Sequence, residues 1–275
     1  MKMNVKTTGR YSLRLACIAF SVLVTTFAAP KAYALTPEEI KGKGTLVVGV
    51  LTDYPPFGGT DSDQQPAGYD VDVSRLMAKQ LGVDLQIVPV TGPNRIPYLL
   101  TGKIDAVVAT FGIIKERTKQ VNFSNPYSAM TIYILGSKEL PVSKPDDLKD
   151  KRIGVTRAST QDTAVMEVAP PESTIMRFDD DATTTQSIIS GQVDVIGASN
   201  TVLATINKEF PDLGVEPKFV LKQQANGIAF RKADTAFRDW TNDFIASIVA
   251  NGQLSEINQR WFGEPLKSLP QMPQF

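Results

Sequence analysis

Residues 44–57 read GTLVVGVLTDYPPF, and this stretch decides the fold class. Residues 45–51 form a short run of apolar and β-branched side chains, which is typical of a strand buried on both faces of a parallel sheet. The loop over residues 53–68 is rich in proline and glycine. Apolar residues then recur at helical spacing up to Gly82, namely Val73, Leu76, Met77 and Leu81. The sequence therefore predicts a strand, a loop and a helix in succession.

The same alternation continues on both sides of this stretch. Thr36 precedes a proline and two glutamates, which predicts a capped helix start. Further strands or extended runs are expected at residues 85–90, 106–110, 130–135, 152–155, 193–198, 217–220 and 227–230. Helices are expected at 96–100, 160–168, 202–206, 235–250 and 254–262, and residues 187–189 are expected to end another helix. About ten strands are more than one compact sheet usually carries. We therefore expect an α/β protein with two mainly parallel sheets, hence two lobes, and a ligand beyond the carboxyl ends of the strands.

The first 34 residues have the order of a secretory signal peptide. Basic residues precede the uncharged apolar stretch 15–29, and Ala32-Tyr33-Ala34 is a small-residue cleavage pattern. The alternative is a membrane anchor, but this stretch is shorter than the roughly 20 residues that a spanning helix needs. Cys17 lies near the start of the apolar stretch rather than after it, which argues against a lipoprotein. We expect cleavage and a periplasmic protein.

Composition excludes several kinds of chemistry. The chain has no histidine, and its single cysteine would leave with the signal peptide. Catalysis by Ser-His-Asp or Cys-His, histidine-ligated zinc and an internal disulfide are therefore excluded. Cleavage would leave 24 basic and 29 acidic residues, a balance that does not suit nucleic acid or anionic lipid. We expect no cofactor, no metal, no membrane insertion and, because no apolar surface stripe requires a partner, a monomer.

Polar residues follow the expected strands where a ligand should lie. Thr110 and Gly112 stand between a strand end and a new helix start, a geometry that aims free N–H groups at an anion. Arg117, on that helix, could grip a carboxylate through two hydrogen bonds. The alternative is an arginine that simply faces water, as most do.

Other strand ends leave two interpretations open. Ser159 and Thr160 follow one strand, and Ser199 follows another; these side chains either hold a ligand or only cap the next helix. Tyr54, held by two following prolines, either forms a flat wall for a ligand or covers the edge of the core. The aspartates at 61, 63 and 179–181 lack the spacing of a calcium loop.

Five stretches in register resemble the polar amino-acid family of bacterial extracellular solute-binding proteins, which feed ABC importers. They are GTLVVGVLTDYPPF (44–57), GYDVDVSRLMAKQLG (68–82), LLTGKIDAVVA (99–109), KERTKQVNFSNPY (115–127) and SGQVDVIGAS (190–199). The resemblance spans roughly residues 38–265 and implies the type II periplasmic binding protein fold. It implies that a ligand lies between two closing lobes. The implied boundaries are 36–133 plus 228–275 for lobe one, 138–223 for lobe two, and about 130–137 and 224–232 for the hinge strands.

The resemblance also implies roles for individual residues. The positions that match ligand-contacting residues of the family are Tyr54, Arg95, Thr110, Gly112, Arg117, Ser159 and Thr160. Arg117 matches the arginine that holds the ligand's α-carboxylate. Arg95 matches an arginine that meets a side-chain carboxylate in the acidic amino-acid branch of the family.

Three positions depart from the family pattern. Ser199 stands where the family usually has an aspartate that neutralises the ligand's ammonium group, Gly112 stands in place of a hydroxyl, and Leu51 where a polar residue is common. A buried ammonium without a counter-charge is costly. Either Asp181 replaces the missing carboxylate, or the ligand is not an ordinary amino acid.

We therefore expect a periplasmic receptor that captures a small carboxylate, most simply an amino acid, and delivers it to the permease of an ABC importer. One alternative is a secreted dehydratase-like enzyme of the same fold. Such an enzyme needs a general acid or base, and only Asp53, Asp181 or a nearby glutamate could serve. Another alternative is a ligand-sensing module, a class that is usually fused to a transmembrane segment.

Overall fold

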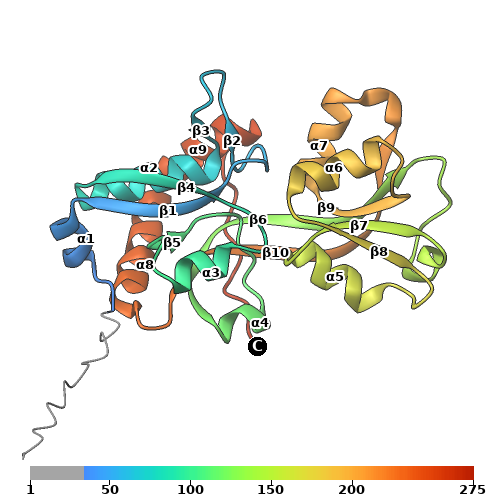
Figure 1. Cartoon of the computed structure of the whole chain (residues 1–275). Coiled ribbons are helices and arrows are strands. Elements are labelled where there is room, and N and C mark those ends of the chain that lie inside the picture. The colour runs from blue at the N-terminus through green and yellow to red at the C-terminus, as the bar shows by residue number, and fades with distance from the viewer. Residues whose placement is uncertain (1–33) are drawn as a thin grey trace, which may run out of the picture. The chain divides into compact units, whose positions relative to one another are not determined.

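A computed structural model describes residues 34–275 (Figure 1). The predicted signal peptide lies outside the described residues, apart from Ala34. Within the described range no helix is both long and apolar enough to cross a bilayer. The helices are α1 (Pro37–Lys43), α2 (Tyr69–Leu81), α3 (Arg95–Leu100), α4 (Lys115–Thr118), α5 (Thr160–Val168), α6 (Asp181–Ile189), α7 (Asn200–Glu209), α8 (Thr235–Ala250) and α9 (Gln253–Phe262), with short 3₁₀ helices η1 (Pro145–Leu148) and η2 (Pro211–Leu213).

The main sheet of the described residues has eight strands in the order β4-β1-β5-β10-β6-β9-β7-β8. The strands are β1 (Thr45–Leu51), β4 (Asp84–Val90), β5 (Ala106–Val107), β6 (Val121–Ser137), β7 (Arg152–Thr156), β8 (Thr174–Phe178), β9 (Val195–Ser199) and β10 (Val215–Arg231), and β2 (Gly59–Thr60) pairs separately with β3 (Pro66–Ala67). β1 is parallel to β4 and β5, and β7 is parallel to β8 and β9. Every pairing of β6 and β10 is antiparallel.

The expectation of two separate sheets is wrong, and the reason is the length of β6 and β10. Each has 17 residues, and they pair from Val121↔Arg231 to Val215↔Ser137. β5 joins β10 at one end of this pair, and β9 joins β6 at the other. Figure 1 shows the two strands running from the half with β1, β4 and β5 to the half with β7, β8 and β9. The exact lobe and hinge boundaries stay a prediction.

Local sequence accounts for the ends of several elements. Thr36 and Glu39 form a reciprocal capping box at the start of α1, as the hydroxyl-proline-acid pattern predicts. α2 ends at Leu81 and is capped by Gly82, which has a left-handed φ of 72°. α2 begins at Tyr69, a full turn before the apolar spacing that starts at Val73, and that extra turn buries Tyr69 and Asp70.

β5 is shorter than expected because the chain turns sharply before Thr110. The expected strand covers 106–110, whereas β5 ends at Val107 and Thr110 adopts a φ of 44°. A left-handed φ is unusual for a β-branched residue and needs support from its surroundings. After the turn, Gly112 forms an isolated bridge with Asn226 of β10 and lies close to Thr160 of α5.

Candidate ligand-binding site

The structure brings all nine predicted site residues together. One small cavity is lined by seven of them, Tyr54, Arg95, Thr110, Arg117, Ser159, Thr160 and Asp181, and also by Met130, Gln161 and Gln224. The other two touch the lining, because Gly112 accepts a hydrogen bond from Arg117 and Ser199 accepts one from Tyr54. The cavity has a volume of about 20 Å³, which is room for a water molecule.

Arg117 reaches from one half of the sheet to the other. Its side chain is only 6% exposed, although it stands on the short α4 helix. Nη1 donates to the Gly112 carbonyl at 2.8 Å and to Thr160 Oγ1 at 3.2 Å, and Nη2 donates to the Ala158 carbonyl at 2.9 Å. Every one of these partners is neutral. The expectation of a solvent-facing arginine is therefore excluded.

Arg95 approaches the same cavity from α3 and is 5% exposed. Its Nη1 donates to the Ala109 carbonyl at 3.0 Å, while its buried Nε has no hydrogen-bond partner. The ring of Phe111 lies against both arginines, with the guanidinium carbons of Arg95 and Arg117 at 4.6 and 4.2 Å from its centroid. A phenyl ring offers a weak attraction to each cation. It gathers two like charges without neutralising either.

The electrostatics of the two arginines favour an anion. Among the ion pairs within 4 Å in the described part of the chain, none involves Arg95 or Arg117. Burial lowers the pKa of both guanidinium groups, and for Arg117 the charge of Arg95 lowers the pKa further. A carboxylate between them would relieve the cost of burying these cations and would form charge-assisted hydrogen bonds.

Asp70 and Arg95 form hydrogen bonds to opposite ends of one peptide group, that between Ala109 and Thr110. Asp70 Oδ2 accepts the N–H of Thr110 at 2.8 Å, and the carbonyl on the other side of the same peptide bond, that of Ala109, accepts from Arg95. Tyr127 donates its hydroxyl to Asp70 Oδ1 at 2.7 Å. Asp70 is fully buried, and burial raises the pKa of its carboxyl to about 7. The Ala109–Thr110 peptide is thus held between a cation and a carboxyl group, which supports the strained φ of Thr110.

Two carboxyl groups lie at the other side of the cavity. Asp181, the first residue of α6, accepts the hydroxyl of Thr156 at 2.6 Å, and burial raises the pKa of its carboxyl to about 7, with the nearby Asp53 adding to the rise. Asp53 accepts the backbone N–H groups of Asp181 at 2.9 Å and Ala182 at 3.3 Å, a contact between the loop after β1 and the start of α6. A cationic group in the cavity would meet negative charge here.

Ser199 has a hydroxyl group at the position where the family usually has the carboxylate of an aspartate. Its Oγ accepts the hydroxyl of Tyr54 at 2.6 Å, lies 2.7 Å from Thr201 Oγ1 and caps α7 by accepting the N–H of Val202. Ser159 likewise caps α5 by accepting the N–H of Asp162 at 3.0 Å. For both serines the capping interpretation is confirmed. Ser159 also lines the cavity, so the two interpretations coexist there.

Sequence reasoning missed several residues that complete the site. Met130 and Gln224 face each other in the β6–β10 register, and Gln161 follows Thr160 on α5. In the sequence, Met130 belongs to an apolar run and is therefore interpreted as a residue of the hydrophobic core. Strand alternation along the expected hinge strands was the signal that could have identified Met130 and Gln224. Asp70 gave no such signal, because an acidic residue in the first turn of a helix needs no further explanation.

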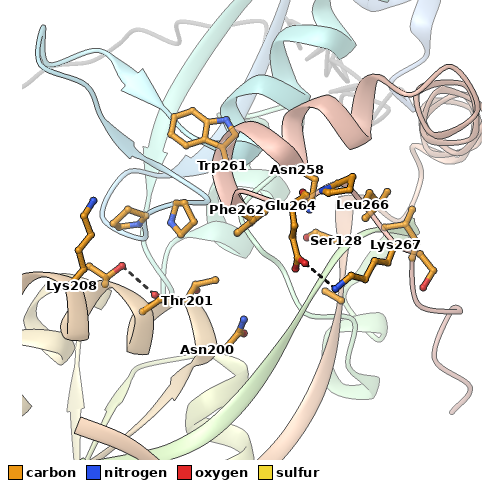
Figure 2. Close-up of a pocket in the computed structure, with 18 of the residues that line it drawn as sticks. Ser128, Asn200, Thr201, Lys208, Asn258, Trp261, Phe262, Glu264, Leu266 and Lys267 are labelled. Carbon is orange, nitrogen blue, oxygen red and sulfur yellow. Dashed lines mark hydrogen bonds and ion pairs between the residues drawn. The ribbon is translucent and has the colours of Figure 1, made fainter. Parts of the chain in front are cut away.

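A larger cavity, here called the α7–α9 groove, lies outside the nine predicted residues (Figure 2). Its volume is about 610 Å³, and its lining includes Pro55, Pro56, Ser128 and Ala129, the α7 residues Asn200, Thr201, Ala204, Thr205, Lys208 and Glu209, and residues of α9 and the segment 264–269. Size alone favours the groove as a binding site. The smaller cavity, by contrast, is lined by the two buried arginines that have no ion-pair partner among the described residues.

Comparisons with known proteins agree with this geometry. The model of the family described as bacterial extracellular solute-binding proteins, family 3, matches residues 46–264. The L-cystine-binding protein TcyJ of Escherichia coli K12 is 29% identical over 227 residues, which cover 82% of this chain and 85% of TcyJ. A mutant of ArgBP from T. maritima superposes with a TM-score of 0.78 at 30% identity, covering 84% of this chain and 100% of that chain.

An ancestral protein links the fold to both of the functions weighed from the sequence. The ancestral amino acid-binding protein AncCDT-1, a precursor of cyclohexadienyl dehydratase, superposes with a TM-score of 0.76 at 33% identity, covering 82% of this chain and 99% of that chain. The three compared proteins are named for binding. The structural matches confirm the type II periplasmic binding protein fold predicted from the five sequence stretches. The chain belongs to the bacterial extracellular solute-binding proteins, family 3.

Proposed function

We propose that this protein captures an amino acid in the cavity between the two halves of its sheet and delivers it to the permease of an ABC importer. The observation that carries the proposal is Arg117, a buried guanidinium that spans both halves and has only neutral partners. An α-carboxylate placed there would replace the carbonyl contacts of Arg117 with stronger, charge-assisted hydrogen bonds. The N–H groups at the start of α5, next to Ser159 and Thr160, would add donors from the other half.

The ammonium group of the ligand is assigned to Asp181. This carboxyl lines the same cavity as Arg117, and its pKa of about 7 would fall when a cation binds beside it. Asp53 adds negative charge next to it. Asp181 would therefore supply the counter-charge that Ser199 lacks. Tyr54 forms the wall between these charged groups and the outside of the cavity, with its hydroxyl fixed by Ser199.

Capture requires the two halves to separate and close again. A cavity of about 20 Å³ has room for a water molecule and is too small for an amino acid. β6 and β10 join the halves, and a bend in these strands would open the cavity while leaving each core intact. Interactions of Arg117 and Asp53 across the boundary would break on opening and re-form around the ligand.

Export and transport partners form part of the same proposal. The pattern of residues 1–34 supports export by a cleaved signal peptide, and family membership supports a permease partner. Binding without turnover is proposed, because the compared proteins are named for binding.

Isothermal titration calorimetry against a panel of amino acids and organic acids tests the proposal. We expect at least one α-amino acid to bind, and Arg117→Ala to weaken its binding by at least about a hundredfold, the value of a charge-assisted pair near 3 kcal/mol. Arg157→Ala is the matched control, because Arg157 is a half-exposed arginine that pairs with Asp179 at the surface. Full affinity in Arg117→Ala would refute the anchor, and the absence of any bound carboxylate would refute the function.

A further inference from the structure

Two side chains that line the small cavity around Arg117 have a buried polar atom without a hydrogen-bond partner. Three such atoms occur among the described residues, and two of them, Arg95 Nε and Gln224 Oε1, belong to this lining. The third, Asp234 Oδ2, lies 2.8 Å from a guanidinium nitrogen of Arg231 in an ion pair. A buried polar atom without a partner is costly, so such atoms are rare in folded proteins. Their concentration at the cavity indicates that a bound group completes their hydrogen bonding.

Neighbouring residues fix the orientation of the Gln224 amide. Its Nε2 donates to the carbonyl of Thr110 at 3.2 Å and to Oδ1 of Asn226. A main-chain carbonyl can only accept, so the amide nitrogen must face Thr110 and the amide oxygen must face away from it. Asn226 is held in turn, because it donates to Ser128 Oγ at 3.0 Å. The oxygen is therefore the atom of the Gln224 side chain that is left for a ligand.

The free oxygen of Gln224 lies close to the proposed carboxylate anchor. A Cβ at position 112 would lie 2.7 Å from Gln224 Oε1 and 2.5 Å from Thr160 Oγ1, so both oxygens lie beside the same point. Arg117 Nη1 donates to Thr160 Oγ1 at 3.2 Å and to the Gly112 carbonyl at 2.8 Å. Any side chain at position 112 would fill this space, which glycine leaves open. Gln224 thus places an acceptor near the guanidinium group of Arg117.

The polarity of this position selects the group that stands beside the carboxylate. An amide oxygen and a carboxylate are both acceptors and repel each other, whereas an amide oxygen attracts a hydrogen-bond donor. In an α-amino acid the donor nearest to the carboxylate is the ammonium group on the α-carbon. An ammonium group has three N–H donors, so Asp181 and Gln224, which line the same cavity, can each accept one. Such a head group offers an acceptor for Arg95 Nε and a donor for Gln224 Oε1.

We infer that Gln224 is a specificity-determining residue of this site, because its amide oxygen accepts a hydrogen bond from the α-ammonium group of the ligand. The inference rests on the proposed function, in which Arg117 holds the α-carboxylate. It adds a contact from β10, one of the two strands that join the halves of the sheet, to the carboxyl group of Asp181. A carboxylic acid without the ammonium group would leave Gln224 Oε1 unpaired and would bind more weakly for that reason.

Calorimetry with matched pairs of ligands tests the inference. Each pair is an α-amino acid and the acid that lacks its α-ammonium group: L-glutamate and glutarate, L-leucine and 4-methylpentanoate, and L-lysine and 6-aminohexanoate. The pair whose amino acid binds the wild type most tightly is used, and its weaker member is measured by displacement. The preference ratio is the affinity for the amino acid divided by the affinity for its partner acid. It should fall at least about tenfold in Gln224→Met, which keeps the length of the side chain and removes the amide oxygen.

Gln223→Met is the matched control, because Gln223 is exposed at the preceding position of β10 and does not line the cavity. It should change neither affinity. If Gln224 only supports the Thr110 carbonyl, Gln224→Met weakens both members of the pair equally, and an unchanged preference ratio would overturn the inference. Gln224→Glu is the second variant should Gln224→Met fail to fold. It keeps an oxygen acceptor, so its preference ratio should be at least that of the wild type, and a lower ratio would overturn the inference.

The same measurements separate this inference from the proposed function. If an amino acid binds and Gln224→Met keeps the wild-type preference ratio, the inference fails while the proposed function stands. If none of the three amino acids binds, the inference fails, and the larger calorimetric panel decides whether the proposed function fails with it.

Discussion

Asp70→Asn removes a buried charge behind the site while keeping the shape of the side chain. The asparagine carbonyl can still accept the N–H of Thr110, and its amide can face the hydroxyl of Tyr127. The charged groups that face Asp70 are few, since Arg95 acts on it through the Ala109–Thr110 peptide and Tyr127 is its direct neighbour. The substitution therefore isolates the carboxyl group.

The structure gives the sign and size of the effect on stability. Burial raises the pKa of Asp70 from 3.8 to about 7, so the folded protein holds this proton more tightly than the unfolded chain. The stability that this group contributes is full below about pH 4 and is lost as the pH rises through about 7. Between pH 4.5 and 8.5 the loss amounts to about 3 kcal/mol. Asp181, with a similar shift, lowers stability in the same direction and would remain in the variant.

Urea unfolding at a series of pH values measures this effect. The free energy of unfolding of the wild type, minus that of Asp70→Asn, should fall by about 3 kcal/mol from pH 4.5 to 8.5. Asp243→Asn, at an exposed position on α8, is the control and should follow the wild type throughout. A difference between wild type and Asp70→Asn that stays constant with pH would refute the argument that Asp70 is held in a protonation equilibrium behind Thr110.

Two further substitutions test how the halves close. Gly112→Ala would place a Cβ 2.5 Å from Thr160 Oγ1, so the two halves could not close to the same position. Calorimetry should find ligand affinity reduced about tenfold, with little change in melting temperature. Unchanged affinity would contradict the close approach of Gly112 to Thr160. Asp53→Ala removes the acceptor for the backbone N–H of Asp181. The loss of about 1 kcal/mol should weaken ligand binding about fivefold. A ligand affinity equal to that of the wild type would mean that this contact does not favour closure of the two halves.

Local signals in the sequence were sufficient for much of the fold. Residues 45–51 form β1 with the expected bounds, and α8 matches its predicted range of 235–250. These elements combine an uninterrupted pattern with clear ends. β8 was missed because it lies at the sheet edge, where its residues are exposed or half-buried without alternation, so nothing distinguishes Thr174–Phe178 from a loop.

Long strands with polar centres were beyond local reasoning. The expected apolar runs at 217–220 and 227–230 are two parts of β10, separated in sequence by Gln223, Gln224 and Asn226. Gln224 and Asn226 can be buried because Asn226 donates to Ser128 Oγ at 3.0 Å and accepts from Gln224. The partner of Asn226 is almost a hundred residues away in the chain, and no window of sequence contains that information.

The site divides in the same way. Arg117 was found because the ends of parallel strands meet at one edge of a sheet, so a single rule places it. Asp181 was already named from the sequence as a candidate replacement for the missing carboxylate, and the structure adds its burial. The role of Asp70 depends on a contact with Thr110, 40 residues later, so Asp70 needed the folded structure. The positions of the strand ends indicate where a ligand lies, whereas the positions of the carboxyl groups around it depend on how the elements pack in the folded protein.

The most direct test of the account compares one bound amino acid with its α-carboxamide on the wild-type protein by calorimetry. The carboxamide keeps the side chain and the ammonium group and removes the negative charge that Arg117 is proposed to hold. We predict that the carboxamide binds at least about a hundredfold more weakly, because a neutral partner cannot form the charge-assisted hydrogen bonds that a carboxylate would form with the buried guanidinium group of Arg117. Equal affinity for the acid and the amide would contradict the claim that paired arginines between the two halves recognise a carboxylate.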